Sequence, residues 1–528
     1  MGRQKRLLSR SVYRLRQRLT PRYDTEDILL EGRFVDDMQE TPQRRRFTRR
    51  GQIILTLALV IVLLLAGLLY SQRYQISQFV RALTVPPTQS VHITPLTLPT
   101  TGIGTATPGQ ASSTDWTTYH ADLARSGFVA GMPDPTHLAS LWKQPLDGAV
   151  YAEPLVVNGE VIAVTENDTL YALDAQSGQI QWHTTVGKPV PLSDLPCGDI
   201  DPLGITGTPV YDPQTGLVFA VAEIQGPAHI LVGVDVKTGQ VKVRRLVDPA
   251  GSNPQTQQQR PALALYGGQV YIGFGGLDGD CGQYHGYLIA SRTDGTGDLL
   301  TYQVPSPNEG AIWATSGPAI DAQGNIYVTV GNGAITQGNW DHSDSVLRFS
   351  PTLQLEDAFA PQSWASENAS DADLGSMGPV LLPNGLLFTH GKTSQGYLLH
   401  TNHLGGIGGQ IQTLSFCDAG AYGGAAVRGQ SAFIPCANGL RELTLGAGAH
   451  LAPGWQAHQQ VTGSPVVGGN TVYSLAPGDG TLYALDATTG SVRATINVGT
   501  TNRFASPTLS QNSVFVGTTT GIVAVGVR

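Results

Sequence analysis

The sequence predicts an all-β fold, an eight-bladed β-propeller, preceded by a single transmembrane helix. The heptapeptide TLYALDA occurs at 169–175 and again at 481–487, and each copy continues through a turn and a glycine into a second strand. Its apolar residues alternate with a period of two, and Asp and Gly are turn residues, so each copy is a β-hairpin. A hairpin repeated across most of a chain indicates a modular fold, and four antiparallel strands ending in such a hairpin form one propeller blade. The 64 glycines and the 14% of charged residues fit this composition of short strands and turns.

The first 72 residues predict a membrane anchor. Residues 1–50 contain fourteen Lys and Arg, which indicates a largely disordered basic tail, with binding to anionic lipid as the alternative. Residues 51–72 carry no charged side chain and are long enough to cross a hydrocarbon core of ~30 Å as a helix. The basic residues before this helix place the N-terminus in the cytoplasm. We therefore expect a single-pass protein of the cell membrane whose remaining residues are extracellular, displayed on a bacterial cell surface.

The extracellular part is predicted to be a stalk followed by the propeller. Residues 73–114 are rich in Pro and Thr, as in extended linkers. The propeller occupies 115–528, with blade-like units that begin near 150, 205, 260, 312, 373, 420, 461 and 504. The last unit ends after three strands, so we expect residues 138–146 to supply its outermost strand and close the ring. The alternative is a seven-bladed ring with an isolated leading strand.

Charge and cysteine content narrow the class of partner. Beyond residue 112 the chain has 33 Asp and Glu against 16 Lys and Arg, and this acidic balance argues against nucleic acid as a partner.

The four cysteines all lie in this acidic part of the chain. Their even number is compatible with two disulfides outside the cytoplasm. Cys417 and Cys436 lie 19 residues apart within one predicted blade, where neighbouring paired strands would allow a structural disulfide.

The motif DWTTYHADLARSG at 115–127, the YALDA hairpins followed by glycine and the eightfold count resemble the quinoprotein alcohol dehydrogenase-like propellers, with their PQQ-binding-like repeats. The resemblance covers about residues 115–528. It implies the fold more strongly than an activity, because the same blades occur in dehydrogenases that use pyrroloquinoline quinone (PQQ) and in non-catalytic scaffolds.

Several positions match the active site that the resemblance implies. Trp313 is similar to the tryptophan on which the quinone stacks, and Asn332 to a calcium ligand in a GN turn. Asp371 or Asp373 is similar to the catalytic base. Each also has a structural interpretation: Trp313 as packing between blades, Asn332 as a turn residue, and the two aspartates as solvated loop carboxylates.

Two positions depart from the family pattern. The family stacks the other face of the quinone on a disulfide between adjacent cysteines, whereas Cys197 is followed by Gly198. The family's calcium-binding glutamate is replaced by Cys281, preceded by Asp280, which could serve as a ligand instead. From this comparison we infer a disulfide between Cys197 and Cys281 at the mouth of the channel.

These observations lead to three functional hypotheses. We expect a non-catalytic binding or scaffold module without a cofactor, whose loops bind a protein, a peptide or a glycan. The alternative is an enzyme, a PQQ- and calcium-dependent dehydrogenase of alcohols or sugars. The second alternative is a sensor of extracellular ligands.

Overall fold

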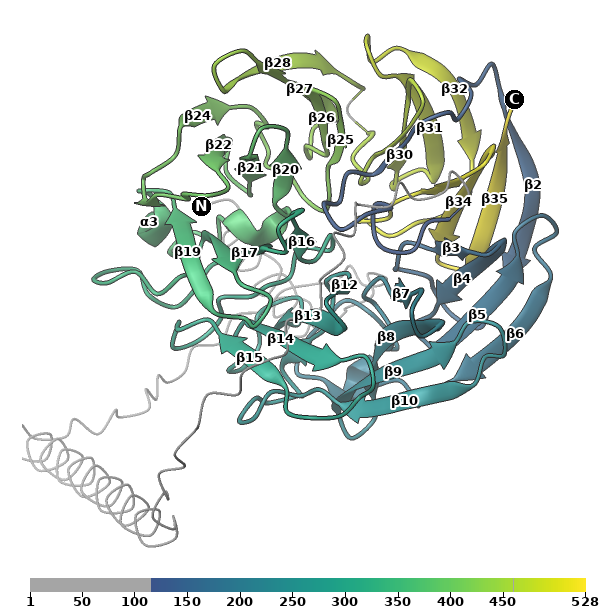
Figure 1. Cartoon of the computed structure of the whole chain (residues 1–528), viewed down its shortest axis with the longest axis horizontal. Coiled ribbons are helices and arrows are strands. Elements are labelled where there is room, and N and C mark those ends of the chain that lie inside the picture. Colours follow the sequence, from purple (N-terminus) through teal and green to yellow (C-terminus); the bar gives the residue numbers. More distant parts are fainter. Residues whose placement is uncertain (1–114, 459) are drawn as a thin grey trace, which may run out of the picture. The chain divides into compact units, whose positions relative to one another are not determined.

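Eight antiparallel sheets surround a central axis, which confirms the prediction of eight blades (Figure 1). The computed structural model describes residues 115–458 and 460–528. The predicted tail (1–50), transmembrane helix (51–72) and stalk (73–114) lie outside the described residues. In the part of the chain that is described, no helix has the length and apolarity needed to cross a membrane.

The first four blades follow the chain in order. Blade 1 contains β3 (Leu155–Val157), β4 (Glu160–Val164), β5 (Thr169–Asp174) and β6 (Ile180–Thr185). Blade 2 contains β7 (Val210–Asp212), β8 (Leu217–Ile224), β9 (Ala228–Asp235) and β10 (Val241–Leu246). Blade 3 contains β12 (Ala264–Tyr266), β13 (Gln269–Gly276), β14 (Tyr287–Arg292) and β15 (Leu300–Gln303), and the short β11 (Gln257–Gln258) pairs with β13. Blade 4 contains β16 (Ala319–Ile320), β17 (Ile326–Val330), β18 (Ser345–Phe349) and β19 (Leu355–Ala360).

The remaining blades complete the ring. Blade 5 contains β20 (Val380–Leu382), β21 (Leu386–His390), β22 (Gln395–His400) and β24 (Gln412–Ser415), and β23 (Gly406–Ile407) pairs in parallel with β19 of blade 4. Blade 6 contains β25 (Ala426–Arg428), β26 (Ser431–Ile434), β27 (Arg441–Gly446) and β28 (His450–Gln456). Blade 7 contains β29 (Val466–Gly468), β30 (Thr471–Ala476), β31 (Thr481–Asp486) and β32 (Val492–Asn497). Blade 8 contains β33 (Thr508–Ser510), β34 (Ser513–Thr518), β35 (Gly521–Val527) and β2 (Leu138–Pro145).

The ring is closed by the strand that the sequence predicts. Strand β2 pairs antiparallel with β35, with Leu138 opposite Val527 and Pro145 opposite Gly521. The pairing joins the two ends of the domain and leaves β35 without a free edge. Short helical segments occur only in connections within the described residues, namely η1 (Leu192–Asp194), α3 (Trp364–Asn368) and η2 (Leu374–Ser376).

Tryptophans on outermost strands fix the spacing between several neighbouring blades. Each packs on the glycine of a turn in the following blade, in three pairs: Trp142 on Gly178, Trp182 on Gly239, and Trp455 on Gly490. These glycines have φ between 70° and 73°, a conformation that favours glycine. A Cβ at each position would also lie within 2.8 Å of the indole, so the close packing excludes any larger residue. Each indole also donates a hydrogen bond to a carbonyl of the same turn at 2.8–3.1 Å. This docking explains why the repeat combines YALDA, a glycine and a tryptophan.

Residues 115–129, which we call the plug segment, run along the inner strands of the ring. The segment makes backbone hydrogen bonds to the innermost strands of blades 1, 2, 4, 6 and 7, through Trp116 to Val156, Thr117 to Tyr211, Leu123 to Ile320, Ser126 to Val427, and Gly127 to Val467. Its last two residues form β1 (Phe128–Val129), which pairs in parallel with β29. Most of its large side chains are fully buried, Trp116 and His120 among them. Most of the polar and aromatic residues of the plug segment therefore serve the interior of the ring.

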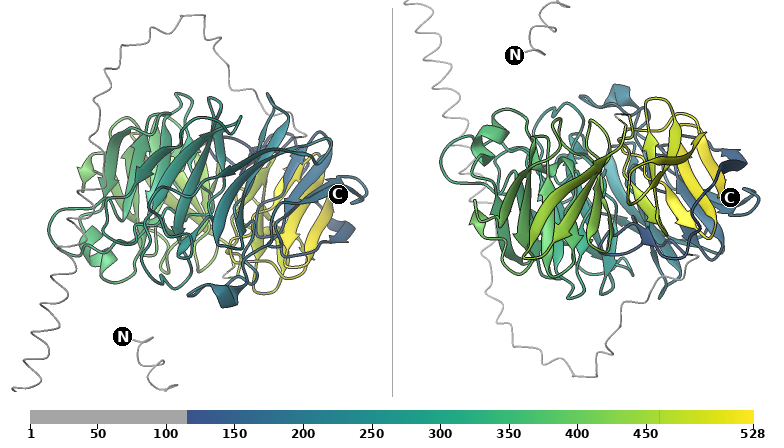
Figure 2. Two further views of the ribbon diagram at one scale, coloured as in Figure 1. Left: turned by 90° about the horizontal axis from the view of Figure 1, so that it is seen from below. Right: turned by 90° about the horizontal axis from the view of Figure 1, so that it is seen from above.

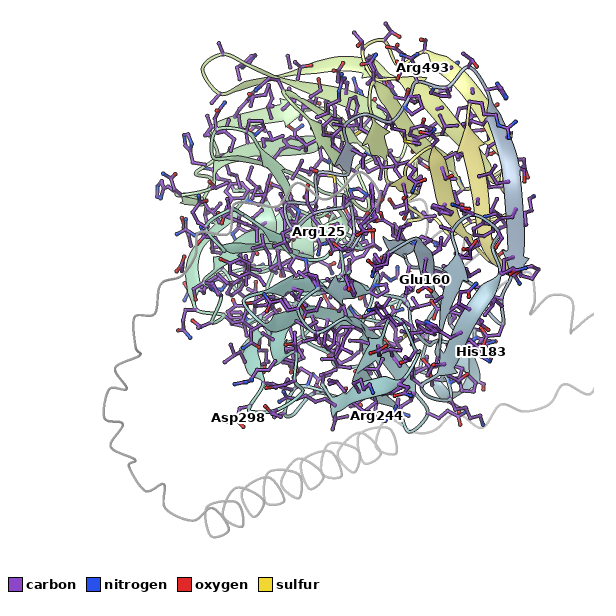
Figure 3. All side chains as sticks on the ribbon, turned by 45° about the vertical axis from the view of Figure 1, so that its right-hand side comes forward. Arg125, Glu160, His183, Arg244, Asp298 and Arg493 are labelled. Atoms are coloured by element: carbon purple, nitrogen blue, oxygen red, sulfur yellow. A yellow bond between two sulfur atoms is a disulfide. The ribbon has the colours of Figure 1, made fainter. Side chains whose placement is uncertain are left out.

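Arg125 is the polar centre of the plug segment. Its guanidinium donates to the carbonyls of Pro318, Leu263 and Tyr119 at 2.9–3.1 Å and to the hydroxyl of Thr118 at 2.6 Å. Figure 3 shows Arg125 inside the ring, whereas Arg493 and Asp298 lie at its margin. Burial lowers the pKa of Arg125 to about 10, so the side chain stays charged at neutral pH. One buried cation thus holds the start of blade 3 and the start of blade 4 against the plug segment.

Candidate functional site

All of the site residues predicted from the sequence lie at one end of the ring. In an antiparallel blade, the turn between its second and third strands and the connection to the next blade lie at the same end. We call this end the connection face. Side views of the ring show loops projecting at both ends of the strands (Figure 2). The connection face carries Trp313 and Asp373 in connections between blades, and Asn332 and Lys392 in turns after second strands.

Asp373, one of the two candidate bases, is the centre of this site. Its side chain is 5% exposed, and its Oδ1 accepts a hydrogen bond from the backbone N–H of Asn332 at 2.7 Å. A Cβ on Gly331 would clash with this carboxylate and would lie 3.0 Å from the indole nitrogen of Trp313. The absence of a side chain at residue 331 therefore lets the carboxylate and the indole approach the same stretch of backbone. Three of the predicted residues, Trp313, Asn332 and Asp373, are adjacent.

Lys392 connects the two candidate bases and was not predicted from the sequence. Its Nζ lies 2.5 Å from Asp373 Oδ2 and 2.5 Å from Asp371 Oδ1, and 5.9 Å from the centroid of the Trp313 ring. The two carboxylates raise the pKa of Lys392 against the opposing effect of its burial, so the ammonium is charged. Asp371 is 61% exposed and contributes less than the buried Asp373. We call Asp371, Asp373, Lys392 and Trp313 the acid–lysine cluster.

Two further carboxylates border this cluster. Glu309 Oε2 accepts a hydrogen bond from the side-chain amide of Asn332 at 3.2 Å. Burial, with the neighbouring charges of Asp280 and Asp373, raises the pKa of Glu309. Asp280 accepts a hydrogen bond from the hydroxyl of Tyr284 at 2.6 Å. Glu309, like Lys392, was not predicted, because nothing in its local sequence marks a residue that approaches Asn332 only in the folded ring.

Both predicted disulfides are present. Cys197 in the connection from blade 1 to blade 2 is bonded to Cys281 in the turn between β13 and β14 of blade 3, with Cα atoms 6.0 Å apart. Because Cys281 follows Asp280, this disulfide fixes the loop that carries the Asp280 carboxylate. The second disulfide joins Cys417, in the connection entering blade 6, to Cys436, which follows β26 of that blade. Both of its cysteines are fully buried.

The residues of this site match a calcium-bound quinone only in part. Calcium takes six to eight oxygen ligands in proteins. Here Asp371 and Asp373 are paired with Lys392, and the side-chain nitrogen of Asn332 donates a hydrogen bond to Glu309. Among the described residues, no three His, Cys, Asp or Glu side chains are grouped closely enough to hold a metal ion. The stacking and charge elements for a quinone are present in Trp313 and Lys392, but the donor set does not fit calcium.

A pocket of about 120 Å³ opens in the channel beside this cluster. Its walls include Arg260, Arg503 and Phe504, and Tyr119 of the plug segment is also part of the lining. Phe504 packs edge to face on Trp313, with ring centroids 6.2 Å apart, so the pocket and the acid–lysine cluster adjoin. None of these four lining residues was predicted from the sequence. Arg260 and Arg503 are two of only 16 basic residues beyond residue 112. The scarcity of basic residues was the one feature of the sequence that could have marked these two arginines as functional.

Comparison with known proteins supports the fold. A family profile described as outer membrane protein assembly factor BamB matches residues 139–243, which run from β2 to β10. No curated protein matches the chain in sequence. Among solved structures, the quinohemoprotein alcohol dehydrogenase ADHIIG from Pseudomonas putida HK5 has a TM-score of 0.61 and 14% identity, over 79% of this chain and 80% of that chain.

Two other structures show the same architecture. A europium-containing methanol dehydrogenase has a TM-score of 0.63 and 15% identity, over 79% of this chain and 98% of that chain. BamB from Moraxella catarrhalis has a TM-score of 0.52 and 15% identity, over 74% of this chain and 100% of that chain. The described residues therefore form a β-propeller. Its fold is similar to that of the PQQ-like propellers, as the resemblance implied, and these similar structures include proteins named as dehydrogenases and BamB, which the matching profile describes as an assembly factor.

Proposed function

We propose that this protein is a membrane-anchored, extracellular binding module without catalytic activity, whose connection face binds a protein, a peptide or a glycan. The anchor is the uncharged segment 51–72, and the orientation follows from the basic residues that precede it. The likeness to BamB supports a binding role for a propeller of this type.

One observation carries the non-catalytic assignment, namely the position of the Lys392 ammonium. It lies between Asp371 and Asp373 and pairs with both carboxylates, where a metal ion would otherwise lie. A metal ion would have to displace a lysine that is held by two ion pairs, one of them with a buried partner. The protein's own ammonium thus already pairs with both candidate bases.

The second candidate function is a PQQ- and calcium-dependent dehydrogenase of alcohols or sugars. It is favoured by the convergence of Trp313, Asn332 and Asp373 at one end of the ring, together with the likeness to the dehydrogenase structures. In this function Trp313 would stack on the quinone, Asp371 or Asp373 would act as the base, and Asn332 with Asp280 would supply calcium ligands.

Calorimetric titration of the full-length protein in detergent separates the two functions. The protein is titrated with PQQ in calcium and, separately, in a chelator. The binding-module function predicts no stoichiometric, calcium-dependent binding of PQQ and no dye-linked oxidation of ethanol or glucose after incubation with both. Calcium-dependent binding at one equivalent, with turnover that is lost in Asp373→Asn, would establish the dehydrogenase instead.

The Lys392→Met variant provides a matched control. Removing the ammonium leaves Asp371 and Asp373 without their cation, so the variant should bind calcium more tightly than the native protein does. Equal calcium binding by both proteins would contradict the view that Lys392 occupies the place of a cation. The exposed Lys237, for which no ion pair is formed within the described residues, provides the comparison substitution Lys237→Met.

A further inference from the structure

The pocket in the channel lies at the connection face, because most of its lining residues belong to connections between blades. The plug segment forms part of its inner lining through Tyr119, whose side chain is buried, and Glu153 beside it is also buried. Phe504 and Asn502, in the connection that enters blade 8, line the same pocket. At about 120 Å³ the pocket is smaller than the ~300–1,000 Å³ typical of sites that enclose a whole ligand. Its size suits one functional group of a ligand.

Two hydroxyl groups in this pocket have unused hydrogen bonds. The hydroxyl oxygens of Tyr119 and Thr315 are buried, and neither has a hydrogen-bond partner among residues 115–458 and 460–528, although Ser464 and Ser506 lie near Tyr119. Burial raises the pKa of Tyr119, so this hydroxyl keeps its proton and can donate it. Buried polar groups in proteins are nearly always paired. An oxygen of a bound molecule would satisfy both donors.

Two guanidinium groups supply positive charge at the same place. The Cζ of Arg260 lies 5.6 Å and that of Arg503 5.7 Å from the centroid of the Phe504 ring, and Arg503 also lies 4.1 Å from the ring of Tyr422. Arg260 approaches the largely exposed Asp199 at 3.5 Å and donates a hydrogen bond to the side-chain oxygen of Gln258 at 3.4 Å. Arg503 forms no ion pair within the part of the chain that the structure describes. The charge of these arginines is therefore largely available to a ligand.

Two acidic residues line the pocket: Asp199, which approaches Arg260, and Glu153. Glu153 is fully buried and accepts hydrogen bonds from the indole of Trp116 at 2.6 Å and from the backbone of His120. Burial raises the pKa of Glu153 well above its ordinary value, which favours the neutral acid. The lining thus combines two guanidinium groups at the rim, one of them beside the largely exposed Asp199, with two unused hydroxyl donors and a neutral acid. This combination is suited to an anion with accepting oxygens.

We propose that this pocket binds a carboxylate group, held by Arg260 and Arg503 at the rim and by the hydroxyls of Tyr119 and Thr315 inside. The proposal rests on the binding-module function and names the chemistry of its ligand. A carboxylate is planar and accepts paired hydrogen bonds from guanidinium groups. It can come from two sources, a free small organic acid or an acidic side chain of a bound peptide.

The test is a titration of the full-length protein in detergent, without PQQ, monitored by calorimetry. The probes are succinate, its neutral analogue succinamide, and the blocked peptides acetyl-Gly-Gly-Asp-Gly-Gly-amide and acetyl-Gly-Gly-Asn-Gly-Gly-amide. Saturable binding of succinate, or of the Asp peptide alone, supports the proposal. Succinate identifies a free acid as the source, and the Asp peptide identifies a side chain.

Two variants and one control decide whether the binding is at this pocket. Arg260→Met should weaken binding by roughly tenfold or more, since it removes a charged hydrogen-bond donor. Tyr119→Phe removes only the unused hydroxyl and should weaken binding by about threefold to tenfold. Arg292→Met removes an exposed arginine paired with Asp294 and should leave binding unchanged. Circular dichroism confirms that each variant is folded.

Two outcomes would overturn the proposal. One is the absence of binding by every carboxylate probe at millimolar concentration, which would leave ordered water as the partner of Tyr119 and Thr315. The other is binding that is equal for succinate and succinamide or unchanged in Arg260→Met. These outcomes differ from the result that would refute the binding-module function. That result is turnover that depends on PQQ and calcium.

Discussion

Replacing Lys392 with methionine should destabilise the propeller by an amount set mainly by Asp373. The Asp373 side chain is 5% exposed and that of Lys392 22% exposed, so the substitution leaves a buried carboxylate without its cation. Removing one member of such a pair costs about 3–5 kcal/mol. The second partner, Asp371, is 61% exposed and adds only about 0–1 kcal/mol. We expect a total loss of about 3–5 kcal/mol at neutral pH.

The double variant Lys392→Met with Asp373→Asn isolates the origin of this loss. Asparagine can still accept the hydrogen bond from the backbone of Asn332, but it carries no charge. The double variant should therefore recover about 2 kcal/mol or more relative to Lys392→Met.

The assay is urea-induced unfolding of the full-length protein in detergent at neutral pH, followed by tryptophan fluorescence. Lys237→Met, at an exposed lysine, is the control and should change the free energy of unfolding by about 0.5 kcal/mol or less. If Lys392→Met were no less stable than this control, or no less stable than the double variant, the assignment of Lys392 as the counter-ion of a buried Asp373 would be refuted.

Two further predictions concern the interior of the ring. Burial raises the pKa of Glu166 from an ordinary 4.5 to about 8, so its contribution to stability is full below about pH 4.5 and is lost as the pH rises to about 8. In Glu166→Gln the amide oxygen can accept the same hydrogen bond from Gly204. The stability of this variant relative to the native protein should therefore rise by about 1–3 kcal/mol when the pH is raised from about 5 to about 9. An equal difference in melting behaviour between the two proteins at both pH values would contradict this prediction. Arg125→Met removes four hydrogen bonds of a buried cation and should cost about 3 kcal/mol or more in urea unfolding, whereas the exposed Arg292→Met should cost about 0.5 kcal/mol or less.

The fold could be predicted from the sequence because each blade is specified by a short local motif that recurs along the chain. TLYALDA and its following glycine specify a hairpin wherever they occur, and the count of such units gives the blades. The closing strand β2 could be predicted because a three-stranded last blade requires a partner and residues 138–146 had none nearby. The role of the plug segment could not, because its partners lie in five blades spread over the whole chain and leave no periodic pattern.

The site was predictable only where it resembles a known arrangement. Trp313, Asn332 and Asp373 could be named because their motifs are similar to those of a family, and the structure brings them together. Lys392 and Glu309 could not, since their importance depends on the direction of side chains across neighbouring blades. The pocket was missed for the same reason: Arg260, Arg503 and Tyr119 come from distant parts of the chain and share no motif.

The plug segment has a consequence for the order in which the domain folds. It is the first part of the propeller to be synthesised, yet its bonds to Val427 and Val467 await blades 6 and 7, which are among the last. Until then Arg125, His120 and the other buried groups of the segment lack part of their final packing environment. The pairing of residues so far apart in the sequence is slow. A chain that stops before blade 7 would lack the strand that pairs with β1, so a premature stop near its end would leave its beginning unfolded.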